Sequence, residues 1–78
     1  MKTTEYFDVI RRRRDRAAIR ESWITWVVAH PQHERKQGDG RIRRWGRIAE
    51  ANGRWLRVVV LADGETVHNA FFDRGFKP

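Results

Sequence analysis

Residues 41–72 read RIRRWGRIAEANGRWLRVVVLADGETVHNAFF and contain three short segments rich in β-branched and aromatic residues, at 41–48, 54–61 and 66–72. Asn52-Gly53 separates the first two segments and Asp63-Gly64 separates the last two. Both dipeptides are typical of hairpin turns, because such turns need residues that adopt positive φ. We therefore predict three antiparallel strands joined by two hairpins.

The length of each turn predicts which residues face one another. With Asp63-Gly64 as a two-residue loop, the second hairpin pairs Val60 with Val67, Val58 with Asn69, Leu56 with Phe71, Val59 with His68, Arg57 with Ala70 and Trp55 with Phe72. With a three-residue bulged loop at 51–53, the first hairpin pairs Ile48 with Leu56, Gly46 with Val58, Arg47 with Arg57 and Trp45 with Val59. A slip of one residue would mix polar and apolar side chains on each face.

This register sorts the side chains onto two faces, because they alternate along a strand. The face that we expect under a helix carries Ile42, Ile48, Leu56, Val58, Val60, Val67 and Phe71. The other face carries Arg41, Arg43, Trp45, Arg47, Trp55, Arg57, His68 and Phe72. Arg44 falls on the helix side, where we expect it at the rim or paired with an acid.

Residues 19–29 are predicted to form a helix that Pro31 ends, since a residue before proline avoids helical dihedrals. Its buried stripe follows three- and four-residue spacing through Ile19, Trp23, Trp26, Val27 and His30, widened by Ile24 and Val28. We expect both tryptophans in the core. Earlier in the chain, 6–10 favours an edge strand or the start of a short helix, and Asp15 is a candidate cap for a turn near Arg16.

Residues 32–37 are a polar strand candidate that Gly38-Asp39-Gly40 turns into the strand at 41–48. The fold class that follows is α+β, with one or two N-terminal helices packed on one face of a roughly four-stranded antiparallel sheet. At 78 residues, the chain is expected to form a single domain over 1–78.

The composition limits the function classes. The chain has no cysteine, which excludes disulfides and thiolate metal sites. Its longest apolar run is far shorter than the ~20 residues of a membrane span, and residues 1–5 lack the apolar stretch of a signal peptide. We expect a cytoplasmic protein without a membrane partner.

The net charge is +7, and of 17 basic residues only Lys2, Lys36 and Lys77 are lysines, so the other 14 are arginines. Arginine pairs bidentately with phosphate and stacks on rings. Nucleic acid or an acidic protein is the natural partner, although a GC-rich genome would also produce an arginine surplus. The run at 11–14 is either a solvated face or a phosphate-binding arm.

The sheet face opposite the helix is the candidate site. Its nucleic-acid-binding residues are Arg41, Arg43, Trp45, Arg47 and Trp55, with Arg74 at the margin. We assign catalytic roles to His68, as proton acceptor or donor, and to Arg57, as a phosphate-stabilising cation. Alternative readings are that carboxylates such as Glu50 or Glu65 neutralise the arginines, that the N-terminal segment or a second subunit covers the rings, and that a strand neighbour satisfies His68.

His30, His33 and Glu34 form a cluster with metal-ligand chemistry at the predicted helix end. No further ligand stands at a suitable spacing in the sequence. We therefore expect neither a metal nor another cofactor.

Three segments resemble a family: GDGRIR at 38–43, LRVV at 56–59 and DGETVHNAFFDR at 63–74. They are similar to an uncharacterised small bacterial domain family allied to the RelE/ParE and BrnT toxin superfamily, over roughly residues 6–77. The resemblance implies a sheet whose open face cleaves RNA and is blocked by an antitoxin. By position, Arg43, Arg47, Arg57 and His68 match the residue types that such faces use, while the terminal tyrosine of RelE-like toxins has no counterpart.

Two functional hypotheses follow. The first is a small RNA-binding protein of the toxin type that acts on single-stranded RNA. If it is catalytic, it is a metal-independent endoribonuclease. An acidic antitoxin-like protein is its expected second partner. The second is a non-enzymatic interaction domain whose basic aromatic face docks an acidic protein or a second copy in a homodimer.

Overall fold

The computed structural model describes all residues from 1 to 78. Three helices come first, α1 (Glu5–Ile10), α2 (Arg14–Ala17) and α3 (Glu21–Ala29). Four strands follow, β1 (His33–Lys36), β2 (Ile42–Ile48), β3 (Arg54–Val60) and β4 (Val67–Phe72), with a 3-10 turn at Ala49–Ala51. The strands form one antiparallel sheet in the order β1-β2-β3-β4. The predicted α+β class is confirmed.

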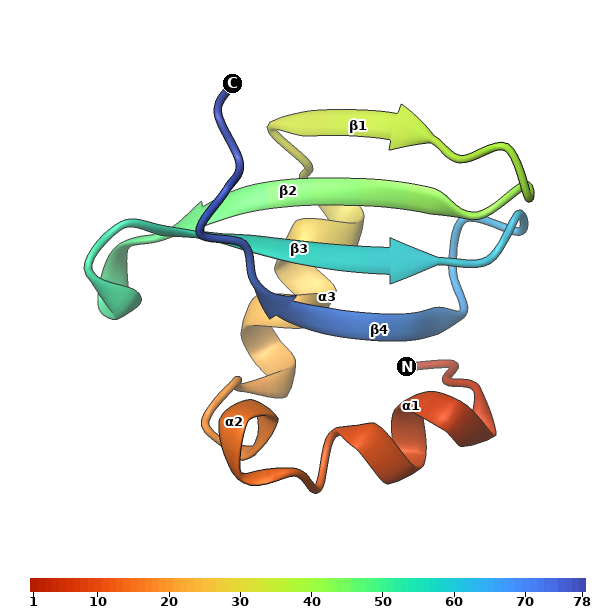
Figure 1. Cartoon of the computed structure of the whole chain (residues 1–78), viewed down its shortest axis with the longest axis horizontal. Coiled ribbons are helices and arrows are strands. Elements are labelled where there is room, and N and C mark those ends of the chain that lie inside the picture. The colour runs from red at the N-terminus through yellow and green to blue at the C-terminus, as the bar shows by residue number, and fades with distance from the viewer.

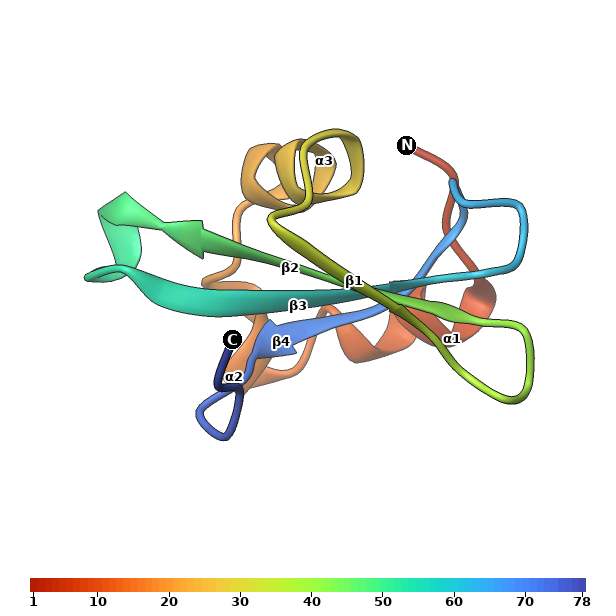
Figure 2. The ribbon, with the colours of Figure 1, turned by 90° about the horizontal axis from the view of Figure 1, so that it is seen from above.

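The three helices occupy two different positions relative to the sheet. Figure 1 shows α3 crossing behind the sheet, with α1 and α2 beside β4. Figure 2 shows the same sheet from above, with α3 on one side and the chain's C-terminal end on the other. We call the face turned away from α3 the open face. The longest helix, α3, has nine residues, well short of a membrane span.

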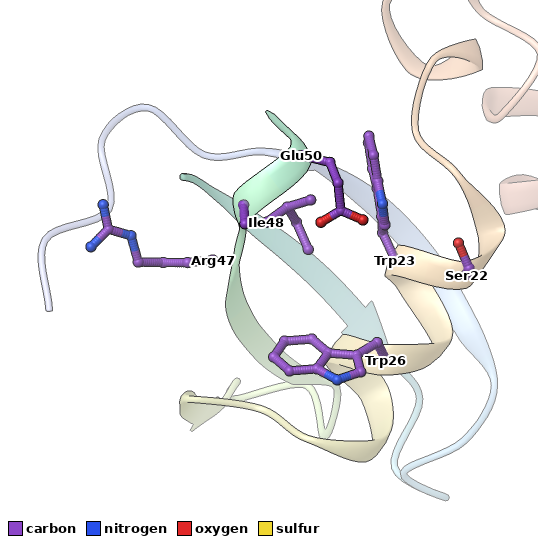
Figure 3. Close-up of a pocket in the computed structure, with 7 residues that line it drawn as sticks. Ser22, Trp23, Trp26, Arg47, Ile48 and Glu50 are labelled. Carbon is purple, nitrogen blue, oxygen red and sulfur yellow. The ribbon is translucent and has the colours of Figure 1, made fainter. Parts of the chain in front are cut away.

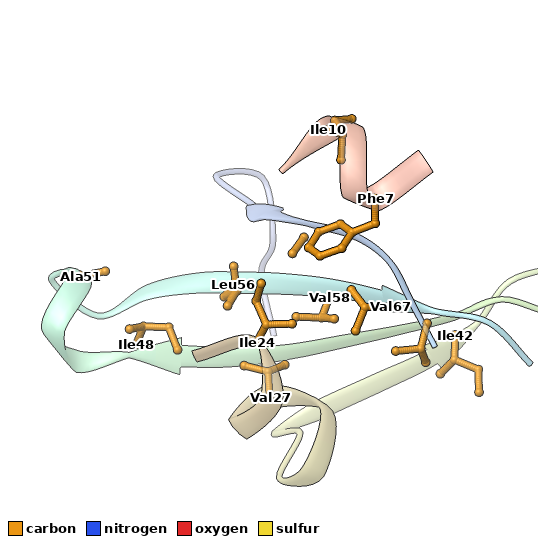
Figure 4. Close-up of a cluster of buried hydrophobic side chains, with 12 residues drawn as sticks. Phe7, Ile10, Ile24, Val27, Ile42, Ile48, Ala51, Leu56, Val58 and Val67 are labelled. Carbon is orange, nitrogen blue, oxygen red and sulfur yellow. The ribbon is translucent and has the colours of Figure 1, made fainter. Parts of the chain in front are cut away.

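One apolar cluster holds the layers together (Figure 4). Its twelve buried side chains come from α1, α3, the 3-10 turn and the three strands β2 to β4: Phe7, Ile10, Ile24, Val27, Ile42, Ile48, Ala51, Leu56, Val58, Val60, Val67 and Ala70. Burial of such side chains is the main driving force for folding. Six of the seven residues predicted under the helix belong to this cluster, and Phe71 is the exception.

The buried stripe of α3 is narrower than predicted, because His30 as well as Trp26 is exposed. Its buried residues are Ile24 and Val27, while Trp23 is half-buried and Trp26 is 44% exposed. The prediction of a core position for Trp26 was therefore wrong. The Trp26 ring instead lies on the edge of the sheet over Gly46, where a Cβ atom would stand 3.2 Å from ring atom Cζ3.

The first hairpin has a longer connection than predicted. The 3-10 turn at Ala49–Ala51 precedes Asn52 and Gly53, whose φ angles of 60° and 71° are both positive. The longer loop moves the register by two residues, so Arg47 faces Trp55 and Trp45 faces Arg57. A shift of two leaves every side chain on its predicted face. The predicted Arg47–Arg57 pair, however, was wrong.

The second hairpin contains a β-bulge, which the sequence did not predict. Val60 pairs with Val67 as expected, but Val59 pairs with Asn69, which leaves His68 as the extra residue. A bulge of one residue reverses the alternation beyond it. Phe71 therefore lies opposite Arg57, and Phe72 lies opposite Leu56 and packs against the core, the reverse of the prediction.

Three local predictions had different outcomes. Arg44 is paired with an acid, because its Nε donates to Glu34 Oε2 at 2.8 Å while Nη1 reaches two backbone carbonyls. Asp15 does not cap a turn: α2 begins at Arg14, and its N-cap, Arg13, makes no side-chain capping bond. The segment at 6–10 is helical, with Thr4 as N-cap.

Candidate functional site

The open face is organised in rows that cross the sheet from strand to strand. One row runs through Arg35, Arg43, Val59 and Asn69. The next row runs through His33, Trp45, Arg57 and Phe71. A third, shorter row joins Arg47 and Trp55. The predicted gathering of arginines and tryptophans on this face is therefore present, with different neighbours.

The C-terminal residues 73–78, which we call the tail, fold over one end of this face. Asp73 Oδ2 accepts hydrogen bonds from Trp45 Nε1 at 3.0 Å and from Arg57 Nε at 3.0 Å, and Arg57 Nη2 lies 2.9 Å away. The Phe76 ring stacks on Trp45 with centroids 4.5 Å apart. Under this cover Trp45 is only 2% exposed. Trp45 was predicted to stack bases, but it offers no free ring face.

The other end of the open face contains a shallow hollow of about 470 Å³, which we call the His68 hollow. It is lined by residues from α1, the β1–β2 connection and the strands β3 and β4: Tyr6, Gln37, Arg41, Arg57, Val59, His68, Asn69 and Phe71. The two residues predicted to be catalytic, His68 and Arg57, thus meet here. Arg41, predicted to bind phosphate, joins them.

The ring of His68 is held on two sides. Its Nδ1 lies 3.0 Å from Thr4 Oγ1, and the Tyr6 ring stacks on it with centroids 4.8 Å apart. Thr4 Oγ1 already accepts the Phe7 backbone N–H. If His68 Nδ1 carries the proton, it donates to the second lone pair of the hydroxyl, and Nε2 is a free acceptor. Nε2 has no hydrogen-bond partner in the structure.

Electrostatics favour the uncharged ring. Partial burial lowers the pKa of His68 below its usual 6.5, and the positive charge of Arg41 lowers it further. The carboxylate of Asp39 opposes this shift. Asp39 also lies 3.6 Å from Arg41 Nη1. A ligand that drew Arg41 into the hollow would therefore change the effects of both Arg41 and Asp39 on the pKa of His68. At neutral pH His68 is therefore set up to accept a proton.

Asp73 is the counter-ion of Arg57. Its partial burial raises the pKa, but the hydrogen bonds from Trp45 and Arg57 and the charge of Arg57 outweigh it, so the pKa of Asp73 lies below its usual value. The carboxylate is thus ionised at neutral pH. It fills two donor positions of the guanidinium that we predicted to hold phosphate.

The remaining predicted residues, Arg47, Trp55 and Arg74, lie at the end of the open face that the tail covers or in the tail itself. Arg47 stays exposed at the Trp55 end, with its Nε donating to the Gly53 carbonyl at 3.0 Å and its guanidinium over the Trp55 ring. Trp55 packs edge-on against Phe76. Arg74 is exposed in the tail and makes no ion pair. The structure therefore does not bring Arg47 or Arg74 to the His68 hollow.

The structure pairs two arginines that the register prediction did not. Arg35 and Arg43 are directly opposite across β1 and β2 on the open face. Arg43 Nε donates to Gln37 Oε1 at 3.0 Å, and Arg35 lies over the Trp45 ring. Neither forms an ion pair with a carboxylate. Like charges facing each other across a strand pair are unfavourable unless an anion lies between them.

Sequence reasoning missed Tyr6, Gln37, Asn69 and Phe71 in the hollow, and the contacts that Asp73 and Phe76 make with Trp45. The bulge hid Asn69, because it moves this residue to the open face. Tyr6 is three residues before Val9 and one before the buried Phe7, so helical spacing would have placed it on the outer side of α1 but not beside His68. No sequence signal shows where a tail folds.

A second hollow, of about 460 Å³, lies on the helix side between α3 and the end of β2 (Figure 3). Trp23 and Trp26 form one wall and Ile48 another, with Glu50 at the rim. Glu50 has no ion-pair partner, so the alternative that Glu50 neutralises the arginines of the open face was wrong. Arg47 also belongs to the lining, but its side chain points away from the hollow (Figure 3). A largely apolar hollow with a free carboxylate does not suit a polyanion.

No group of three histidine or acidic side chains is close enough to hold a metal ion. His33 lies instead against the rings of Trp55 and Phe76. No protein-family model matches the chain, and neither curated proteins nor solved structures give a match. The resemblance to RelE- and BrnT-type toxins therefore stays a prediction.

Proposed function

We propose that this chain binds single-stranded RNA on its open face and cleaves it at the His68 hollow without a metal, as a protein of the toxin type. The observation that carries the proposal is the meeting of Arg41, Arg57 and His68 at one hollow. A neutral histidine supplies the proton acceptor that phosphodiester chemistry needs, and the guanidinium groups of Arg41 and Arg57, whose counter-ions are Asp39 and Asp73, supply the charge.

The unpaired arginines of the neighbouring row support RNA binding. Arg35 and Arg43 face one another beside the hollow without a carboxylate. A phosphate between them would remove their repulsion and accept charge-assisted hydrogen bonds. With Arg41, they mark a path for about two consecutive phosphates across β1 and β2. The exposed Tyr6 ring at the hollow offers a flat surface to a base.

The cleavage step follows from the orientation of His68. In the tautomer that carries its proton on Nδ1 and donates it to Thr4 Oγ1, Nε2 takes the proton of a ribose 2′-hydroxyl. The 2′-oxygen then attacks phosphorus, the bond to the 5′-oxygen breaks, and that oxygen takes a proton from water. The products are a 2′,3′-cyclic phosphate and a 5′-hydroxyl. Arg41 and Arg57 would stabilise the extra charge on the pentacoordinate phosphorus.

Binding is tested by fluorescence anisotropy with a labelled twelve-nucleotide oligouridylate at several salt concentrations. Affinity should fall with salt, and Arg35→Gln and Arg43→Gln should each weaken it about tenfold and reduce the salt slope by roughly 0.7 per lost phosphate contact. Arg20→Gln is the control, because it removes the same charge on the α3 side. Equal loss for all three would contradict an open-face site.

Cleavage is tested on the same oligonucleotide in the presence of EDTA. His68→Asn should abolish the 2′,3′-cyclic product while leaving affinity within about twofold, and a 2′-O-methyl substrate should bind without being cut. If the wild-type chain is instead a nucleic-acid-free dimer with no affinity for RNA at low salt, the alternative of an interaction domain is favoured. If His68→Asn still cuts, the catalytic assignment is wrong.

A further inference from the structure

The tail places an anion and a ring where a nucleotide would present a phosphate and a base. Asp73 offers a carboxylate to Arg57 from 2.9 Å, and Phe76 offers a ring to Trp45 at a stacking distance of 4.5 Å. Arginine and tryptophan are also the groups that hold phosphates and bases in single-strand binders. The tail thus satisfies in cis the contacts that an RNA strand would make.

The ring cluster around Phe76 is larger than one stacked pair. Trp55 and His33 approach the Phe76 ring edge-on or tilted, with centroids 5.1 and 5.4 Å away. Together with Trp45 they form a three-sided box around one aromatic ring, which we call the ring box. A box of this size accepts one flat ring, and a nucleobase has the required shape.

The tail is held by few contacts outside the ring box. Beyond β4, its backbone hydrogen bonds are Asp73 N–H to the Trp55 carbonyl and Phe76 N–H to the Asp73 carbonyl. None of the twelve core residues belongs to it. Opening the tail would therefore leave the twelve-residue core cluster and the strand pairing intact.

We propose that the ring box of Trp45, Trp55 and His33, with Arg57, is a second nucleotide subsite that the tail keeps closed. This inference rests on the proposed RNA binding. A base of the bound strand replaces Phe76 and a phosphate replaces Asp73, and release of Asp73 frees Arg57 to face the adjoining His68 hollow. Arg57 lines the His68 hollow and also binds Asp73 of the tail, so displacing the tail from the ring box would give the hollow an unpaired guanidinium group.

The expected change in RNA affinity depends on how the molecules divide between a closed-tail and an open-tail form. If only a fraction of molecules has an open tail, the apparent dissociation constant is raised by the inverse of that fraction. One aromatic stack accounts for a ~3–10-fold preference for the closed form. Phe76→Ala should tighten RNA binding by about this factor, and Asp73→Asn should do so as well because it frees Arg57.

The experiment compares oligouridylate binding by wild type, Phe76→Ala, Phe76→Leu and Asp73→Asn, each checked for folding by thermal melting. Glu65→Gln is matched to Asp73→Asn, because it removes one negative charge from an exposed position next to Lys2. The tail variants should bind more tightly than both wild type and Glu65→Gln, with Phe76→Leu between wild type and Phe76→Ala.

Three outcomes separate the proposed function from the closed subsite. If wild type binds RNA and loses affinity in Arg43→Gln, but no tail variant binds more tightly, the proposed function stands and the closed subsite is wrong. If neither wild type nor folded Phe76→Ala binds RNA, both are wrong. If Asp73→Asn and Glu65→Gln tighten binding equally, only net charge is acting, and this overturns the claim.

Discussion

Phe76 lies flat on the indole of Trp45, with an angle of 16° between the ring planes, and accounts for the burial of a tryptophan on an otherwise open sheet face. The two residues are far apart in sequence, and the contact joins the end of the chain to the second strand. It determines which half of the open face is free.

Phe76→Ala should expose Trp45 and destabilise the fold by about 1–2 kcal/mol, because it removes an aromatic stack and part of its apolar area. Tryptophan emission should shift to longer wavelength and become more sensitive to acrylamide. Urea denaturation gives the free energy of unfolding. Lys77→Ala, next to it in the tail, should change neither quantity; an unchanged emission in Phe76→Ala would show that the tail does not cover Trp45 in solution.

Asp73→Asn should lower the free energy of unfolding by roughly 1–3 kcal/mol, since Arg57 would keep a hydrogen-bond acceptor but lose its charged partner in a largely buried pair. Glu65→Gln breaks an exposed ion pair with Lys2 and should cost well under 1 kcal/mol. Chemical denaturation of both variants measures the difference. Equal effects would mean that the Asp73–Arg57 pair is as weak as a surface pair.

Gly46→Ala should destabilise the fold by about 1–3 kcal/mol, because the new Cβ would stand 2.9 Å from Val27 Cγ2 and 3.2 Å from Trp26 Cζ3. Val27 is fully buried and cannot move aside. Gly38→Ala is the matched control, since nothing lies within 4 Å of its new Cβ. Thermal unfolding compares the two; a neutral Gly46→Ala would mean that α3 does not pack this closely on β2.

Stability should depend on pH through His68. Its pKa is lowered in the folded state, so between that value and about 6.5 the unfolded chain binds more protons than the folded one. The free energy of unfolding should therefore fall as pH decreases from 7.5 through this window. His68→Gln should remove that slope, whereas His30→Gln, outside the hollow, should keep it. Urea titrations at several pH values make the comparison.

Local pattern predicted much of this fold correctly. Alternation along 42–48 and 54–60 assigned side chains to the right faces even though the hairpin register was off by two, because face depends only on odd or even position. Asn52 and Gly53 adopt the positive φ angles that their identity predicts. Arg44 was expected to find an acid on the apolar side, and it binds Glu34.

Contacts between segments far apart in the sequence determined the features that local pattern did not predict. His68 is bulged and bonded to Thr4, 64 residues earlier, and this single extra residue exchanges the faces of Phe71 and Phe72. The tail reaches Trp45 and Arg57, and α3 buries Val27 as predicted but leaves Trp26 exposed. Side-chain periodicity is a property of each strand or helix alone, so the sequence determined the elements and most of their faces. Which segments meet depends on the packing of the whole chain, so only the tertiary structure decided that His68, Arg41 and Arg57 share one hollow and that the tail closes the other end.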